Sequence, residues 1–160
     1  MQSNYDNYPN KRFGPEPVAK TTQLAIWIML STMCRIGETT LARWENVDLD
    51  AGIWTIPKDN VKDKVARLDV FLSEFSLEQF RALHCLTGHT RFCFLARYNG
   101  GTVDCKTIGK QINDRQSRFK KSLDGSPRKP MKNRLHDNTL VLDASKGAWT
   151  PHDLRRTGQR

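Results

Sequence analysis

An apolar face recurs at helical spacing in the segment TTQLAIWIMLSTM, near the start of the chain. Leu24, Ala25, Ile28, Met29 and Met33 follow one another at intervals of one, three and four residues, as positions on one side of a helix do. This pattern predicts a helix that is central to the hydrophobic core.

The segment RIGETTLARW, which comes next, predicts a turn followed by a second, short helix. Gly37 is expected to interrupt helical structure, and Leu41, Ala42 and Trp44 then resume an apolar helical pattern. Arg35 is therefore expected in or beside a turn.

Two short segments predict a β-hairpin with a polar connection. Ile53–Ile56 and Arg67–Leu72 have the composition of strands and lie within reach of each other along the chain. The connection is lysine-bearing, and its tip or the adjoining strand ends are expected to carry Lys58, Lys62 and Lys64.

Helices are predicted again in the second half of the chain. Ser76 and Gln79 have capping-box spacing, which predicts a helix over SLEQFRALHCL, and Phe92–Leu95 is predicted to be a short buried strand. A further helix is expected over Thr107–Lys121. Its inward positions are Ile108, Ile112 and Phe119, and its basic outer face comprises Lys110, Arg115, Arg118 and Lys120.

The remaining segments are predicted to be irregular. Residues 1–15 show no apolar periodicity and are expected to form a linker or arm. Residues 124–146 are expected to be mostly loop, with one possible strand at Leu140–Leu142. Pro151 is placed to open a last helix.

Charge and cysteine usage narrow the class of protein. The formal net charge of +9 favours a polyanionic partner, DNA or RNA, over a merely soluble basic protein. The four cysteines form no CxxC pair, and neither a signal peptide nor a membrane-spanning run is present, which favours a cytoplasmic protein without a membrane partner. Cys85, His89 and Cys93 recur every four residues, but Gly88 interrupts that helix and a fourth ligand is missing, so no metal site is predicted.

The string TPHDLRRT carries the sharpest candidate chemistry. His152 and Arg155 lie three residues apart, on one face of the last predicted helix. An arginine fork can bind two phosphate oxygens, and a neighbouring histidine can donate a hydrogen bond or pass a proton. The pair predicts a phosphate site, although HxxR by itself also fits ordinary surface charges.

Three motifs occur in the order that tyrosine recombinases of the phage-integrase family show: RIGE, the lysine-bearing hairpin, and HDLRRT. The chain resembles the catalytic domain of that family over roughly Val18–Arg160. Its sequence is most similar to those of integrases of prophages and genomic islands in bacteria. The resemblance implies a mainly α-helical fold with a small antiparallel β-sheet, incomplete at its C-terminus. It divides the chain into an arm, residues 1–15, and a partial catalytic domain, residues 16–160.

The resemblance also implies roles for individual residues. The family attacks a DNA phosphodiester with a tyrosine and forms a 3′-phosphotyrosyl link without metal or cofactor. Arg35 and Arg155 match its catalytic arginines, which stabilise the charge that develops on the phosphate, and His152 would act as acid or base. Glu38 would orient the site, and Arg156 would face a carboxylate or the DNA backbone. A structural alternative for Arg35 is that it caps the preceding helix.

The matching lysine, which would protonate the leaving 5′-oxygen, is best assigned to Lys62 and next to Lys64. At least one of the hairpin lysines is expected to be freely solvated. Arg35, Lys62, His152 and Arg155 are expected to converge on one basic concavity.

No nucleophile is assigned, because Tyr5, Tyr8 and Tyr98 all precede HDLRRT. The resemblance therefore implies a chain cut off before its tyrosine, as an expressed fragment or as a truncated gene product. Such a chain would bind phosphate and duplex DNA without forming the covalent intermediate. Its partners would be double-stranded attachment sites and other integrase protomers in a synapse. The alternatives are a non-catalytic basic DNA-binding module, an RNA-binding domain and a type IB topoisomerase.

Overall fold

The chain forms helices and one small sheet, as predicted. The structure is a computed structural model that describes residues 19–96, 100–114, 123–126 and 149–157. The elements of these residues are α1 Lys20–Thr32, α2 Ile36–Thr40, η1 Trp44–Asn46, β1 Val47–Asp48, β2 Ile53–Ile56, η2 Lys58–Asn60, β3 Leu68–Phe71, α3 Glu74–Thr87, α4 Cys105–Asp114 and α5 Pro151–Thr157, where η marks a 3-10 helix.

The chain divides into two units, which are described separately. One comprises Ala19–Lys110 and Trp149–Arg160, and the other comprises Met1–Val18 and Gln111–Ala148. The described part of the second unit is the end of α4 and a turn in which Asp124 accepts hydrogen bonds from the backbone N–H and the hydroxyl of Ser126. The predicted arm, residues 1–15, lies outside the described residues.

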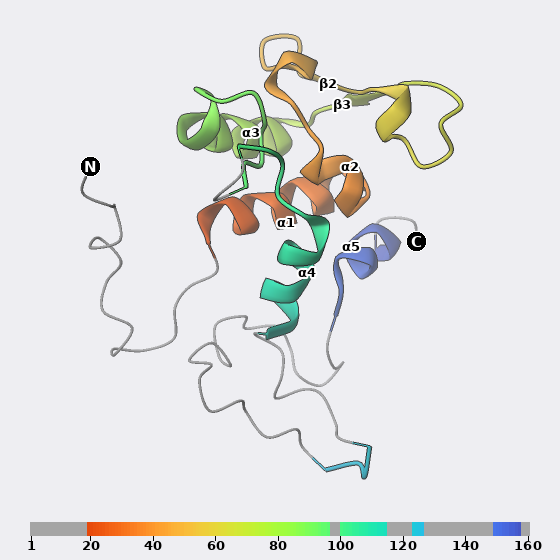
Figure 1. The fold of residues 1–160 in the computed structure, drawn as a ribbon. Coiled ribbons are helices and arrows are strands. Elements are labelled where there is room, and N and C mark those ends of the chain that lie inside the picture. Colours follow the sequence, from red (N-terminus) through yellow and green to blue (C-terminus); the bar gives the residue numbers. More distant parts are fainter. Residues whose placement is uncertain (1–18, 97–99, 115–122, 127–148, 158–160) are drawn as a thin grey trace, which may run out of the picture. The chain divides into compact units, whose positions relative to one another are not determined.

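Helix α1 is central to the first unit, where it contacts α2, α3 and α5 (Figure 1). Four of the five residues of its predicted apolar face are buried, since Leu24, Ala25, Ile28 and Met29 are each at most 1% exposed, whereas Met33 is only half-buried and lies beyond the helix. The helix ends at Met33, which adopts the left-handed conformation with φ 58°. This turn directs the chain into α2.

The three strands form an antiparallel sheet in the order β1, β2, β3. Trp54 of β2 pairs with Val47 on one side and Val70 on the other. Trp54 and Ile56 are each 1% exposed, while the residues that alternate with them are only half-buried, so one face of the strand meets the core. The Trp54 ring lies 5.6 Å from that of Phe80, which packs the sheet against α3.

The second helix differs from the prediction. A break was expected at Gly37 with a helix over Leu41–Trp44, whereas α2 runs through Gly37 and ends at Thr40. The start of α2 is fixed by Glu38, whose carboxylate accepts the backbone N–H of Arg35 at 2.7 Å. This capping contact outweighs the weak helix propensity of glycine.

The predicted cap of α3 was also wrong. The N-cap is Ser73, whose hydroxyl oxygen accepts the backbone N–H of Ser76 at 3.3 Å. Ser76 lies inside the helix and is 1% exposed, and its hydroxyl donates to that of Ser31 in α1 at 2.9 Å. The hydroxyl of Ser76 thus links two helices.

Two later elements need correction. Phe92 and Leu95 form isolated bridges with Arg43 and Thr102 instead of the predicted strand, although the two residues between them are buried. Helix α4 begins at Cys105, two residues earlier than predicted.

The buried positions of α4 are as predicted, because Ile108 and Ile112 are at most 2% exposed. Lys110 is exposed, also as predicted. Residues 115–121 of the predicted helix and the possible strand at 140–142 lie outside the described residues. No helix in the described part of the chain is long and apolar enough to cross a membrane.

Replacement of Phe80 by alanine is expected to lower the free energy of unfolding by about 3–5 kcal/mol, because the ring is fully buried between Trp54 and Trp44. Urea denaturation followed by circular dichroism measures this loss. Phe71→Ala is the matched control, since Phe71 is 79% exposed and its loss should cost less than about 0.5 kcal/mol. Equal losses in both variants would contradict the assigned core.

Candidate phosphate-binding site

Arg35 stands at the junction of α1 and α2. It is the N-cap of α2, in an extended conformation, two residues after the left-handed Met33. The Arg35 carbonyl accepts the backbone N–H of Thr39 at 2.9 Å and its hydroxyl at 3.1 Å. The backbone of Arg35 is therefore held by the first turn of α2. Arg35 caps the helix that follows it, whereas Met33 caps the helix that precedes it.

Glu38 accepts two hydrogen bonds from Arg35, one from its backbone and one from its side chain. Its buried carboxylate accepts the Arg35 backbone N–H at 2.7 Å through Oε2 and the Arg35 Nη1 at 3.0 Å through Oε1. The Glu38 side chain is 2% exposed, whereas that of Arg35 is 37% exposed. The guanidinium is thus fixed on its inner side and open on its outer side.

The Cys34 thiol, next to Arg35 in the sequence, is affected by the charges of both Arg35 and Arg155. Burial raises the pKa of the Cys34 thiol to about 11, while the positive charges of Arg155 and Arg35 both act on the thiol in the lowering direction. The two arginines are 120 positions apart in the sequence (155 − 35). Their shared action on one side chain places them in the same region of the unit, in agreement with the contact between α1 and α5.

Helix α5 carries Arg155 together with His152. Arg155 is half-buried and His152 is exposed. Among the described residues no carboxylate lies within 4.0 Å of the Arg155 guanidinium. Arg156 is exposed, and its Nη1 lies 3.9 Å from Oδ1 of Asp153.

The start of α5 is tied to Asp153. Oδ2 of its carboxylate accepts the backbone N–H of Thr150 at 2.8 Å and the Thr150 hydroxyl at 2.7 Å. These two bonds, the hydroxyl first, hold the pKa of Asp153 below its usual value, with smaller contributions from Arg156 and His152.

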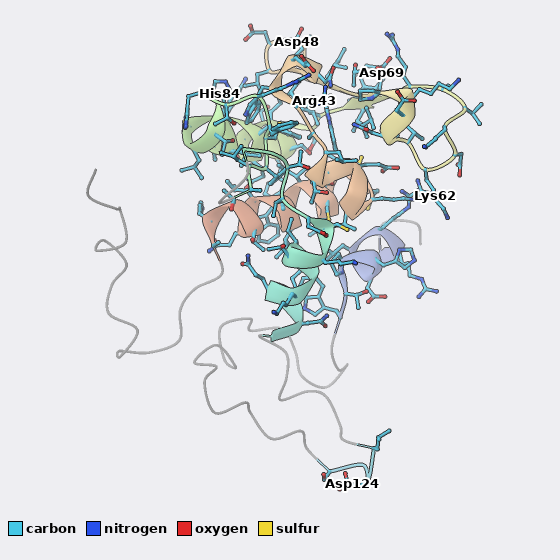
Figure 2. The ribbon with its side chains drawn as sticks, in the orientation of Figure 1. Arg43, Asp48, Lys62, Asp69, His84 and Asp124 are labelled. Atoms are coloured by element: carbon cyan, nitrogen blue, oxygen red, sulfur yellow. The ribbon has the colours of Figure 1, made fainter. Side chains whose placement is uncertain are left out.

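The lysine candidates lie in the connection between β2 and β3. Lys62 and Lys64 are both exposed, and Lys64 adopts a left-handed conformation with φ 48°. Its backbone N–H donates to the carbonyl of Val61 at 3.1 Å, which closes a turn around Lys62. In Figure 2, Lys62 extends from this connection on the side of the unit where α2 and α5 lie, whereas Arg43 lies nearer β1 and α3.

The structure pairs Arg35 with Glu38, and the charges of Arg35 and Arg155 both act on Cys34, but no hydrogen bond or ion pair among the described residues joins Arg155, His152 or Lys62 to Arg35. Their convergence on one concavity stays a prediction. A hollow of about 640 Å³ lies elsewhere and includes none of the predicted site residues; it is lined by Trp44, Glu45, Asn46, Val47, Asp48, Leu49, Asp50, Ile53, Thr55 and His84.

The cysteines and the histidine that recur every four residues, Cys85, His89 and Cys93, lie in different environments. Cys85 and His89 are exposed, while Cys93 is fully buried. No group of three His, Cys, Asp or Glu residues that could hold a metal ion occurs in the described part of the chain.

Sequence reasoning missed two features of this site. One is the bond between Thr150 and Asp153, for which TPHD, a Ser/Thr-x-x-Asp/Glu pattern ahead of a helix, was an available signal. The other is that the charge of Arg155 acts on Cys34, for which sequence spacing offers no signal because it depends on the tertiary contact between α1 and α5.

Comparisons with known proteins identify the family and the fold of the chain. The family model described as Phage integrase family matches residues 6–159. The crystal structure of XerA recombinase is similar, with a TM-score of 0.54 and 17% identity over 93% of this chain and 50% of that chain. A comparison with curated protein sequences gave no match.

Two structures of the Tn1549 transposon integrase are similar as well. The complex with circular intermediate DNA has a TM-score of 0.53 and 17% identity over 89% of this chain and 46% of that chain. The complex with transposon right end DNA has a TM-score of 0.53 and 14% identity over 98% and 58%. The chain therefore spans about half the length of these solved proteins and shares the fold of that half. With a family model that matches nearly all of its residues, the chain belongs to the phage integrase family of tyrosine recombinases.

Proposed function

We propose that this chain holds a DNA phosphodiester between Arg35 and Arg155 and contributes this site to site-specific recombination. The observations that support the proposal are the contact between α1 and α5 and the positive charge that both arginines exert on Cys34. Arg35 is oriented by a buried carboxylate, and Arg155 has no carboxylate within 4.0 Å among the described residues. A bound phosphate would give both guanidinium groups an anionic partner.

The chemistry follows from these positions. Attack on a phosphodiester builds negative charge on the non-bridging oxygens, and two preoriented guanidinium groups stabilise that charge. His152, on the same helix face as Arg155, would exchange a proton near the attacking hydroxyl. Lys62, exposed on its turn, would protonate the leaving 5′-oxygen. This mechanism needs no metal ion or organic cofactor.

Double-stranded DNA at an attachment site is the proposed substrate, and other integrase protomers are the proposed partners. The net charge of +9 supports a polyanionic substrate. Two of the similar structures are complexes of a transposon integrase with DNA, which supports the same class of ligand. The rival proposal is a basic DNA-binding module in which no arginine is special.

Phosphate binding separates the two proposals. Arg35→Ala and Arg155→Ala are each expected to weaken the affinity for inorganic phosphate by about tenfold or more, because a hydrogen bond to a charged group contributes roughly 1.5–3 kcal/mol. The measurement is a titration of the ¹⁵N-labelled chain followed at the arginine Nε–H resonances.

Arg43→Ala is the matched control for this titration. It removes the same charge from a side chain that is 38% exposed, against 37% for Arg35, and whose carboxylate partner, Glu45, is exposed and not buried as Glu38 is. Its affinity should stay within about twofold of wild type, because exposed ion pairs contribute little. An equal loss in all three variants would favour the basic module instead.

Glu38→Ala is expected to lower the free energy of unfolding by about 1.5–3 kcal/mol, since it removes a buried carboxylate that accepts two hydrogen bonds from Arg35. The same change at Glu45, which is 55% exposed, should cost less than about 1 kcal/mol. Urea denaturation of both variants makes the comparison. Similar costs would mean that Glu38 does not fix the arginine.

We further propose that none of the tyrosines in the sequence is the nucleophile. Tyr5, Tyr8 and Tyr98 lie ahead of HDLRRT and outside the described residues. The 160-residue polypeptide, incubated with a pool of nicked DNA duplexes, is expected to form no denaturant-resistant adduct on a gel. An adduct that disappears on replacement of one of these tyrosines by phenylalanine would overturn this assignment.

A further inference from the structure

We propose that Asp153 is a positioning residue that sets the start of α5 and thereby aims Arg155 and His152 at the phosphate. The inference rests on the proposed function of the site. It concerns a residue that carries no assigned role and that lies within the helix of the predicted catalytic pair.

Helix α5 needs such support because it is short and only partly buried. It has seven residues, and none of them is fully buried. Helices shorter than about 12–15 residues are marginal on their own in water. Its stability must therefore come from its contact with α1 and from bonds at its ends.

Asp153 makes bonds at both ends of the helix. Ahead of the helix its Oδ2 accepts the backbone N–H and the hydroxyl of Thr150, and its backbone N–H donates to the Thr150 carbonyl at 3.0 Å. In the last turn, the hydroxyl of Thr157 donates to the carbonyl of Asp153 at 2.9 Å. The carboxylate thus ties the incoming chain to the first turn.

Geometry separates Asp153 from direct contact with substrate. Successive helical residues are rotated by about 100°, so positions 153 and 155 point about 200° apart. Asp153 therefore faces away from the phosphate that Arg155 would bind, and its negative charge is kept from that anion. It acts through the helix and is not a catalytic residue.

The hydrogen bonds from Thr150, more than the nearby charges, keep Asp153 ionised. Its pKa is lowered first by the Thr150 hydroxyl, then by the Thr150 N–H, and further by Arg156 and His152. A carboxyl group with a lowered pKa in the folded state contributes stability above its ordinary value of 3.8, and this contribution is lost as the pH falls through the lowered pKa. The Asp153 carboxylate is therefore ionised at neutral pH, and its hydrogen bonds with Thr150 contribute fully there.

The test uses the full 160-residue chain and inorganic phosphate as the probe. Asp153→Ala removes the acceptor, Asp153→Asn retains an acceptor oxygen without the charge, and Thr150→Val removes the donor hydroxyl. Thr157→Val is the control, because it removes a hydroxyl bond to the Asp153 carbonyl and leaves the carboxylate in place. Phosphate affinity is read at Arg155 Nε–H, and the carboxyl pKa by ¹³C resonance.

We expect Asp153→Ala to weaken phosphate affinity by about tenfold, a loss of the size that follows removal of a helix cap. Asp153→Asn should restore affinity to within about threefold of wild type, and Thr157→Val should leave it unchanged. Thr150→Val should weaken it and raise the pKa of Asp153 toward 3.8. This variant keeps the proposal testable if Asp153→Ala does not fold.

Two kinds of failure can be told apart. Wild-type affinity in both Asp153→Ala and Thr150→Val would overturn the positioning role and leave the phosphate site standing. Equal losses in Asp153→Ala and Asp153→Asn would also overturn it, because charge and not hydrogen bonding would then be the cause. A wild-type chain that does not bind phosphate through Arg155 would sink the proposed function, and this inference with it.

Discussion

The buried face of α1 is the constraint on which the rest of the unit depends. Leu24, Ala25, Ile28 and Met29 are almost completely removed from water, and the helix that carries them contacts α2, α3 and α5. Because apolar burial is the main favourable contribution to folding, this face fixes how α1 packs against its neighbours. The end of α1 in turn places Cys34 and Arg35, and its contact with α5 places Arg155. One packing surface thus determines the relation between two arginines that are far apart in the sequence.

The sequence patterns predicted most of the elements but not all of their ends. Periodicity identified α1 because it buries one face, and strand composition identified β2, which buries Trp54 and Ile56, and β3, which is mostly exposed but pairs with β2. Local rules failed where a tertiary contact competes with them. Ser76 has the spacing of a helix cap, yet its hydroxyl is drawn to Ser31 on another helix, and Ser73 caps α3 in its place. Gly37 lies within α2 because Glu38 caps that helix.

The site was predictable to a similar extent. Residue order and the strings RIGE and HDLRRT predict which arginines belong to the proposed site, because a family resemblance preserves the identity of site residues even when their contacts are unknown. The distances could not be predicted, since they depend on how α5 docks against α1. The position of the Lys62 ammonium group could not be predicted either, because Lys62 is exposed on a turn midway along the connection between β2 and β3.

The two arginines also differ in how their charge is balanced, and this difference bears on how the site works. Arg35 has a buried carboxylate partner, so its orientation is set before any ligand arrives. Arg155 has no carboxylate within 4.0 Å among the described residues, and its orientation depends on a short helix. An anion bound beside Arg155 would give this cation a partner. In the proposed site that anion is the DNA phosphate, and because the same phosphate would contact Arg35, ligand binding and the docking of α5 on α1 should stabilise each other.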